Sequence, residues 1–234
     1  MGKIFVTSDT HFGHDREFLW GPRGFSNYME HDAAVIKNWN SVVGPDDIVY
    51  HLGDVMLGDN AYGMNCLRQL NGTIYIIPGN HDTSTRIKLY KTLENIHVLE
   101  SGIPGLEAAA ATFKYKKYNF YLSHHPTMTS NLEKAPYLKM HLINLFGHTH
   151  QQNKFYMSMP YMFHVGMDSN NCTPVLLDDA IEMMKRETAI CIEMLGLQEE
   201  QKNECETCGH NPQCSASADG KRCKDYLADP LLGD

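Results

Sequence analysis

The first half of the chain alternates short apolar runs with longer stretches whose apolar positions recur at helical spacing. The short runs are rich in β-branched and aromatic residues, which predicts buried strands at 4–6, 48–52 and 73–77. The longer stretches predict helices at 28–43, 61–70 and 83–93. Strands that alternate with helices indicate βαβ units around a largely parallel sheet.

The helix that begins at about Tyr28 has clear end signals. Asn27 is a favoured N-cap residue with Glu30 three positions later, and Gly44-Pro45 ends the pattern. The stretch 12–25 before this helix is rich in Gly, Arg and aromatic residues, so we expect a loop there. The apolar stripe of the helix contains Met29, Ala33, Ile36, Trp39 and Val43.

After about residue 95 the pattern changes to closely spaced strand candidates. This spacing predicts a second sheet with more antiparallel hairpins. Residues 178–195 have apolar positions at helical spacing and are expected to form a closing helix. The strand candidates lie at 96–99, 110–115, 119–122, 142–146, 154–157 and 161–165.

From residue 198 onward the chain is polar and poor in large aliphatic residues. We therefore expect one folded domain over residues 1–197 and a separate tail over residues 198–234. The tail contains eight acidic and four basic residues, so it carries −4, which is half of the formal charge of −8.

Residues with metal-binding side chains follow the predicted strands. Five apolar runs end in a Gly or Ser that precedes an Asp, Asn or His. In an open α/β sheet the carboxyl ends of the strands share one crevice, so we expect these residues to converge. The five segments are Ser8-Asp9-Thr10-His11, Gly53-Asp54, Gly79-Asn80-His81-Asp82, Ser123-His124-His125-Pro126 and Gly147-His148-Thr149-His150.

The residue types indicate a metal centre. Carboxylate, amide and imidazole ligands together suit Mn, Fe, Zn, Co or Ni better than Ca or Mg alone. Seven such ligands are too many for one ion and fit two ions that share a bridging carboxylate. Two ions ~3.5–4 Å apart are a known device for phosphoester hydrolysis. A single DxH or HxH is more typical of a polar loop than of a metal site, and Asn80 alone is typical of a turn, so the inference depends on the whole set.

Four further histidines lie inside strand-like runs. We interpret them as packed or partly exposed residues rather than as ligands. They are His51, His97, His141 and His164.

The motifs DxH, GD, GNHD, a His-containing fourth element and GHxH, in this order, resemble those of the calcineurin-like metallophosphoesterases. The resemblance covers about residues 1–196 and implies a four-layer α/β/β/α sandwich of two mixed sheets. It implies that one metal is held by Asp9, His11, Asp54 and His150. It implies that the other is held by Asp54, Asn80, His124 and His148, so that Asp54 bridges the two.

The resemblance also implies roles for the two residues after Asn80. His81 corresponds to the family's catalytic histidine near the leaving group, and Asp82 would orient His81 rather than bind metal. We expect a hydroxide between the metals to attack phosphorus in line. We expect His81 to stabilise the transition state and to protonate the departing alkoxide.

The shared motifs do not separate the activities found in the family. The body is too short for the extra capping domain expected of a duplex-DNA nuclease, so a small phosphodiester or nucleotide is the favoured substrate. A phosphomonoesterase and a nuclease acting on nucleic-acid ends stay open as alternatives. A non-catalytic binding platform would lack some ligands, and none of the seven is missing.

Selectivity is expected from the loops around the crevice. An Arg there would pair with a phosphate oxygen, and an aromatic ring would stack on a base. An ordinary packed or solvated loop is the alternative. The candidates are His14, Arg16, Trp20 and Arg23 in the first loop, and residues 127–139 after His124.

Charge and hydropathy restrict the partners. A charge of −8 argues against a protein that binds nucleic-acid backbone, although two bound divalent ions would make the crevice attractive to a phosphate. No apolar stretch approaches the ~18 residues of a membrane span. Met1-Gly2-Lys3 leads directly into a strand without the apolar region of a signal peptide. We therefore expect a cytoplasmic protein with no membrane partner.

The cysteines form two groups. Clustered thiols in a chain that is not secreted indicate a metal site, and the tail thiols suit one structural zinc ion, with His210 as an alternative ligand. An iron–sulfur cluster and free thiols in a disordered tail stay open. The tail thiols are Cys205, Cys208, Cys214 and Cys223; Cys66, Cys172 and Cys191 are expected to be small core residues.

Overall fold

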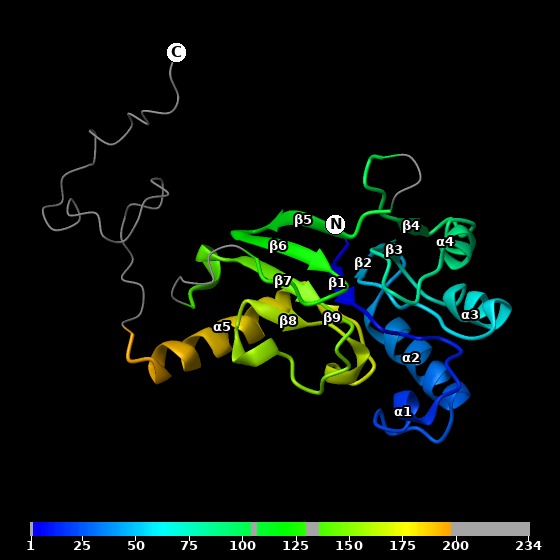
Figure 1. Cartoon of the computed structure of the whole chain (residues 1–234), viewed down its shortest axis with the longest axis horizontal. Helices are drawn as coiled ribbons and strands as arrows, with labels where there is room; N and C mark the ends of the chain where they lie inside the picture. Colours follow the sequence, from blue (N-terminus) through cyan, green and yellow to red (C-terminus); the bar gives the residue numbers. More distant parts are fainter. Residues whose placement is uncertain (1, 104–106, 130–135, 198–234) are drawn as a thin grey trace, which may run out of the picture.

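Two β-sheets form the centre of the protein in the computed structural model, which describes residues 2–103, 107–129 and 136–197 (Figure 1). The first sheet has the strand order β4-β3-β2-β1-β9, and the second has the order β5-β6-β7-β8. Each sheet combines parallel and antiparallel pairs, so the predicted α/β class with two mixed sheets is confirmed.

The first sheet is mostly parallel. Strands β1 (Ile4–Thr7), β2 (Ile48–His51), β3 (Thr73–Ile76) and β4 (Ile96–Val98) all run in one direction. The two-residue strand β9 (Val175–Leu176) pairs antiparallel with β1. The carboxyl ends of β1, β2 and β3 therefore lie at the same edge of the sheet.

The second sheet contains one hairpin. Strands β5 (Ala110–Tyr115) and β6 (Tyr118–Ser123) are antiparallel, whereas β7 (Leu142–Phe146) and β8 (Met162–His164) are added in parallel. The prediction of antiparallel hairpins is therefore confirmed for β5 and β6 and wrong for β7 and β8, which pair in parallel. The connections before β7 and β8 are each longer than a dozen residues, which is enough for a crossover between parallel strands.

The longer described helices pack into the two hydrophobic clusters that lie on opposite faces of the first sheet. Helices α2 (Tyr28–Val42), α3 (Asn60–Leu67) and α4 (Ser84–Tyr90) pack together on one face, and α5 (Leu177–Met194) follows β9. The short α1 (Glu17–Trp20) lies beside α2 (Figure 1). None of these helices has the length and apolar character needed to cross a membrane.

Neighbouring residues of β1 enter two different hydrophobic clusters. Phe5 packs with residues of α2, α3 and α4, whereas Val6 packs with the second sheet and α5. Adjacent side chains of a strand point to opposite faces, so the first sheet separates the two clusters. The ring centroids of Tyr50 in β2 and Phe113 in β5 lie 5.3 Å apart, which shows that the two sheets face each other.

The N-terminus of α2 is capped as predicted, but its buried face differs. The side chain of Asn27 accepts a hydrogen bond from the backbone N–H of Glu30, at 2.9 Å. Met29 is 55% exposed, while His31 and Asp32 are fully buried. The polar pair is buried because it belongs to a network beneath the site, described below.

Three elements differ from the sequence expectations. Residues 154–157 do not form a strand: Phe155 makes only an isolated bridge to Phe163, and Tyr156–Ser158 is a 3₁₀ turn with Met157 at φ 50°. The loop at 12–25 contains the four-residue helix α1. Strand β9 was missed because two residues are too few to show a period.

Candidate metal centre

Five loops meet where the strands of both sheets end. Asp9, Asp54 and Asn80 follow β1, β2 and β3, and His124 and His148 follow β6 and β7. The first two loops are joined by backbone hydrogen bonds from Asp9 N–H to Gly53 O and from His11 N–H to Asp54 O, both 3.0 Å long. The seven residues expected to bind metal are thus brought into one region from across the chain.

Glycines allow these loops to approach one another. A Cβ on Gly79 would lie 2.3 Å from Asp54 Oδ1 and 2.8 Å from His124 Cε1. A Cβ on Gly147 would lie 2.4 Å from Asp9 Oδ2. Real Cβ atoms do not come this close to other atoms, so the Gly that precedes Asn80 and the Gly that precedes His148 are required by packing.

Five of the seven candidate ligands have left-handed backbone conformations. Such φ values are uncommon for residues other than glycine, and they concentrate at functional sites, where the surrounding structure holds them. The strain is consistent with side chains that the loops force toward a shared point. The residues and φ values are Asp9 60°, His11 49°, Asp54 56°, His148 67° and His150 48°.

The first cluster surrounds the buried imidazole of His11. His11 Nε2 lies 3.6 Å from Asp54 Oδ2 and 3.9 Å from Asp9 Oδ1. Asp9, His11 and His150 offer ligand atoms that all lie within 4.8 Å of one another. Neither ring nitrogen of His11 has a hydrogen-bond partner among the described residues. A buried imidazole without partners is unfavourable unless a further group, such as a metal ion, binds it.

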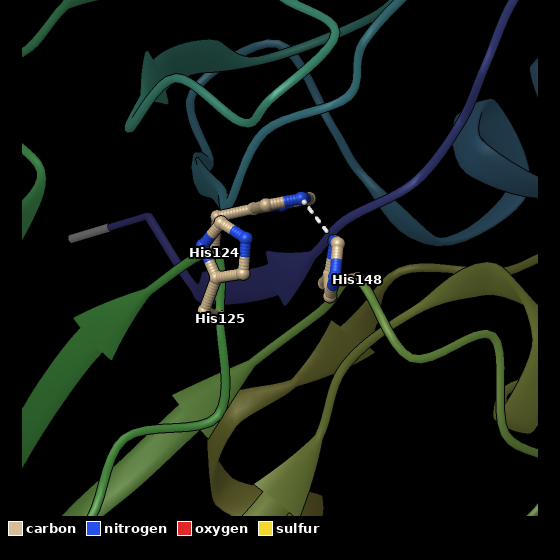
Figure 2. Close-up of side chains that lie close together, drawn as sticks. All are labelled: His124, His125 and His148. Carbon is tan, nitrogen blue, oxygen red and sulfur yellow. Dashed lines mark hydrogen bonds between the residues drawn. The ribbon is translucent and has the colours of Figure 1, made fainter.

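The second cluster contains Asn80, His124 and His148. Asn80 Oδ1 lies 2.8 Å from His124 Nε2 and 2.9 Å from His148 Nδ1. Figure 2 shows His148, from the loop after β7, beside His124 and His125, with the contact of 3.2 Å between His148 Nδ1 and His124 Nε2 drawn as a dashed line. Asp54 Oδ2 lies 3.5 Å from His124 Nε2, so this carboxylate is near both clusters.

The donor set fits divalent transition metals. The Nδ1–H of His124 donates to the backbone oxygen of Leu52 at 2.8 Å, so Nε2 carries the lone pair of the neutral ring. This nitrogen lies 2.8 Å from Asn80 Oδ1. Imidazole nitrogens, carboxylate oxygens and an amide oxygen therefore converge as lone-pair donors, with few N–H groups among them. Mixed nitrogen and oxygen ligands of this kind suit Mn, Fe, Co, Ni or Zn.

Burial changes the protonation of these groups. Burial raises the pKa of Asp9, although the nearby His124 and His150 and the 2.6 Å hydrogen bond from Ser8 Oγ act in the opposite direction. Burial also holds the pKa of His11 well below its usual value, so His11 is neutral and has a free lone pair. These are the protonation states that metal binding requires of imidazole.

A crevice of about 280 Å³ opens beside the clusters. His81 lines it with a side chain that is 44% exposed, and its Nε2 lies 4.0 Å from Asp54 Oδ2. The backbone N–H of His81 donates to Asp54 Oδ1 at 2.8 Å. His81 is therefore held next to the candidate metal ligand Asp54, while its ring faces the crevice.

Asp82 has a different role from the one expected. Its carboxylate accepts hydrogen bonds from the backbone N–H groups of Asp54, Val55 and Gly79 and from the hydroxyl of Tyr90, at 2.7–3.1 Å. No hydrogen bond joins it to the His81 ring in the described structure. Asp82 fixes the loop after β2 to the loop after β3, and it does not orient His81 directly.

Arg23 does not face the crevice, which corrects its interpretation as a substrate-binding residue. Its side chain is 1% exposed and binds Asp168 through two hydrogen bonds of 2.7 and 3.0 Å. The same guanidinium donates to the backbone oxygen of Asp9 at 2.9 Å and to His31 Nε2 at 2.9 Å. His31 in turn lies 2.7 Å from Asp32, which accepts a hydrogen bond from Gly13 N–H.

The other candidates of the first loop are divided. His14 lines the crevice, whereas Arg16 and Trp20 do not. Burial lowers the pKa of His14, and the neighbouring His81 lowers it further. Of residues 127–139, the structure describes 127–129 and 136–139, and none of these lines the crevice. The tail cysteines lie outside the described residues.

Sequence reasoning missed Asp168 and His125. Asp168 Oδ2 lies 2.9 Å from His150 Nδ1, so it orients a candidate ligand. Burial acts to raise the pKa of Asp168, but the hydrogen bonds to His150 and Arg23 hold it well below its usual value. The signal was present, because Gly166-Met167-Asp168 also follows an apolar strand.

His125 was overlooked beside His124, although the ring centroids of His125 and His148 are 4.2 Å apart.

Comparisons with known proteins agree with this geometry. The calcineurin-like phosphoesterase superfamily domain matches residues 3–166. An uncharacterized protein of Methanocaldococcus jannaschii is 32% identical over 192 residues, covering 80% of this chain and 93% of that protein. The Gene 66 protein of Mycobacterium phage D29 is 28% identical over 204 residues, covering 79% of this chain and 96% of that protein.

A solved structure supports the fold. A protein of unknown function from Aquifex aeolicus has a TM-score of 0.54 at 20% identity, covering 78% of this chain and 100% of that one. The family match spans more than half of this chain and includes all five loops that carry the candidate ligands. The chain therefore belongs to the calcineurin-like phosphoesterase superfamily.

Proposed function

We propose that this protein is a hydrolase that uses two divalent transition-metal ions to cleave a small phosphodiester or nucleotide. The observation that carries the proposal is the pair of ligand clusters that meet at Asp54. In the first of them, neither ring nitrogen of the buried His11 has a hydrogen-bond partner among the described residues. Both clusters open onto the same crevice.

The protein's own residues then have separable tasks. Two bound cations would lower the pKa of a shared water and neutralise charge on the phosphoryl oxygens. Asp54 holds the two clusters together, and its Oδ1 fixes the backbone of His81. The half-exposed His81 ring is free to donate a proton to the alcohol that leaves.

The crevice size favours a small substrate. Its volume of about 280 Å³ lies just below the usual range for ligand pockets. A small phosphoester fits such a space, whereas a nucleic-acid duplex would need a larger surface. We favour a phosphodiester over a phosphomonoester as the physiological substrate.

A substrate panel tests the activity. The full chain is assayed with Mn²⁺ on bis-p-nitrophenyl phosphate, p-nitrophenyl phosphate and 2′,3′-cyclic nucleotides. We expect hydrolysis that requires Mn²⁺, with the diesters turned over faster than the monoester. A faster reaction with the monoester would identify a phosphomonoesterase. Absence of hydrolysis for every ester would contradict the proposal and favour a binding platform.

A second assay tests the role of His81. We expect His81→Gln to reduce kcat by about 10²-fold or more on an ester with a poor leaving group. The loss should be much smaller on a nitrophenyl ester, because nitrophenolate leaves without a proton. Equal losses on both esters would argue against proton donation.

A further inference from the structure

The crevice beside the metal centre has two unlike walls. Candidate ligands and His81 form one wall. An aromatic and apolar surface forms the remainder, and no residue of that surface takes part in the proposed chemistry. This second wall consists of His14, Phe18, Leu19 and Leu57.

Phe18 is unusual within this wall because it is 73% exposed. Its neighbour Leu19 is only 3% exposed and anchors the short helix α1 in the protein. Folding therefore fixes the position of Phe18 without covering its ring. A fixed, uncovered aromatic ring at the edge of a crevice is available to pack against a planar group of a ligand.

A row of rings leads from Phe18 to the metal centre. The ring centroids of Phe18 and His14 lie 5.4 Å apart at an interplanar angle of 84°. The His14 ring lies 5.4 Å from the ring of His11, and the His11 ring lies 5.6 Å from that of His81. Phe18 is thus two ring contacts from a candidate ligand, on the part of the crevice that His81 also lines.

This placement matches the alcohol part of an ester. A phosphoryl group held by the ligands would direct its leaving alcohol toward His81. A ring carried on that alcohol through a sugar or a short linker would then reach Phe18. An alcohol without a ring would leave Phe18 exposed to water.

We propose that Phe18, together with Leu57, forms a subsite for a planar aromatic group on the esterified alcohol, such as a nucleobase. This subsite would select nucleoside and aryl phosphoesters over sugar or alkyl phosphoesters. The inference rests on the proposed function, because it requires the phosphoryl group to lie at the metal ligands. Stacking of a base on an aromatic side chain changes affinity by roughly 10- to 100-fold.

The test compares two ligands that share a ribose and a 5′-phosphate and differ at C1′, where one carries a base and the other a hydroxyl group. Binding of AMP and of ribose 5-phosphate to the full chain in Mn²⁺ is measured by calorimetry, since both ligands carry the same sugar and phosphate. We expect AMP to bind about 10-fold or more tightly than ribose 5-phosphate. Phe18→Ala should bring the two affinities close together, and Phe18→Trp should preserve the preference.

Two controls separate the subsite from general effects. Met194→Ala removes a side chain that is 81% exposed on α5, outside the crevice, and should leave both affinities unchanged. Ribose 5-phosphate should bind equally well to wild type and Phe18→Ala. Equal affinity of the wild type for both ligands, or a preference that survives Phe18→Ala, would overturn the inference.

Failure of the inference is distinguishable from failure of the proposed function. Hydrolysis of bis-p-nitrophenyl phosphate with Mn²⁺ by the wild type reports on the metal centre. If the wild type hydrolyses this ester but shows no preference for AMP, only the subsite is wrong. If it hydrolyses no ester and binds neither ligand in Mn²⁺, both proposals are wrong.

Discussion

Asp168 connects the candidate ligand His150 to the buried Arg23. Its Oδ2 lies 2.9 Å from His150 Nδ1 and 2.7 Å from Arg23 Nη2. Burial acts to lower the pKa of His150, but the hydrogen bond to Asp168 raises it on balance. Such an outer partner fixes the ring orientation of a ligand and increases its basicity. Arg23 also holds the backbone oxygen of the left-handed Asp9.

We predict that Asp168→Asn lowers the affinity for divalent metal by about 10- to 100-fold, because His150 loses its charged partner. The variant also leaves the Arg23 guanidinium buried without a counter-charge, which should destabilise the fold by about 3 kcal/mol. Metal titration and urea unfolding measure the two effects. Asp178→Asn, which removes an exposed ion pair with Lys116, is the control and should change neither. An unchanged metal affinity in Asp168→Asn would show that Asp168 does not support the site.

His51 is a buried histidine outside the candidate ligands. Its Nδ1 accepts a hydrogen bond from Gly53 N–H at 3.2 Å, and its Nε2–H donates to Thr10 Oγ1 at 3.0 Å. The ring is therefore neutral, and burial lowers its pKa to about 3. His164 is also buried, with a pKa of about 4. Both rings take up a proton more readily in the unfolded chain.

We predict that the free energy of unfolding decreases as pH falls below about 6.5, the pKa of an unperturbed histidine. Below that pH the unfolded state binds protons that the folded state does not, so each buried histidine steepens the slope by up to ~1.4 kcal/mol per pH unit. Urea unfolding of metal-free protein between pH 7.5 and pH 4.5 measures the slope. His51→Gln should reduce it, whereas substitution of the exposed His97 should not. An unreduced slope in His51→Gln would mean that His51 is not the group that titrates.

At the scale of elements, the site is formed by loops pressed against one another. The loop after β3 reaches the loop after β2 through Gly79, and Asp82 accepts hydrogen bonds from both. The buried polar face of α2 supports the first loop, because Asp32 accepts from Gly13 N–H at 2.7 Å. The helix therefore contributes polar contacts to the site, although its sequence pattern indicated only an apolar stripe.

We predict that Gly79→Ala destabilises the protein by about 1–3 kcal/mol, because the added methyl has no free space. It should also weaken metal binding, since the nearest atoms belong to Asp54 and His124. Urea unfolding and metal titration measure both effects. Gly44→Ala is a matched control, because its Cβ would meet no atom closer than 3.4 Å. Wild-type stability and metal affinity in Gly79→Ala would contradict the packing argument.

At the scale of the whole molecule, the candidate ligands come from both sheets. Asp9, Asp54 and Asn80 follow strands of the first sheet, while His124 and His148 follow strands of the second. Bound cations would therefore connect the two sheets at one end of the sandwich. A ligand that binds only the folded state stabilises it, by ~2.7 kcal/mol at a concentration 100 times its Kd.

We predict that chelation lowers Tm and that Mn²⁺ restores it more effectively than Ca²⁺ or Mg²⁺, because imidazole ligands favour transition metals. Thermal unfolding with and without chelator tests this, and an unchanged Tm would contradict it.

Metal analysis should find two ions per chain in a protein that ends after Leu197. Additional zinc in the full chain alone would belong to the cysteine-rich tail, and equal metal in both proteins would exclude a tail site.

The sequence alone was sufficient for the order of the long elements and for the segments that contain the candidate ligands. Hydrophobic period and end signals are local properties, so α2 could be located from Asn27, Glu30 and Gly44-Pro45. The motifs are also local, because each Gly–ligand pair directly follows its strand. The tail and its cysteines stay a prediction from sequence.

Only the tertiary structure decided which side chains face the crevice and which support it. Arg23 and Asp168 are 145 positions apart, and Arg23 is buried against Asp168 instead of facing a substrate. Phe18 is exposed at the crevice while the adjacent Leu19 is buried. The left-handed φ of His11 likewise depends on a distant segment, because its backbone N–H donates to Asp54 O in the loop after β2. These features depend on contacts between distant parts of the chain, and a local pattern contains no information about such contacts.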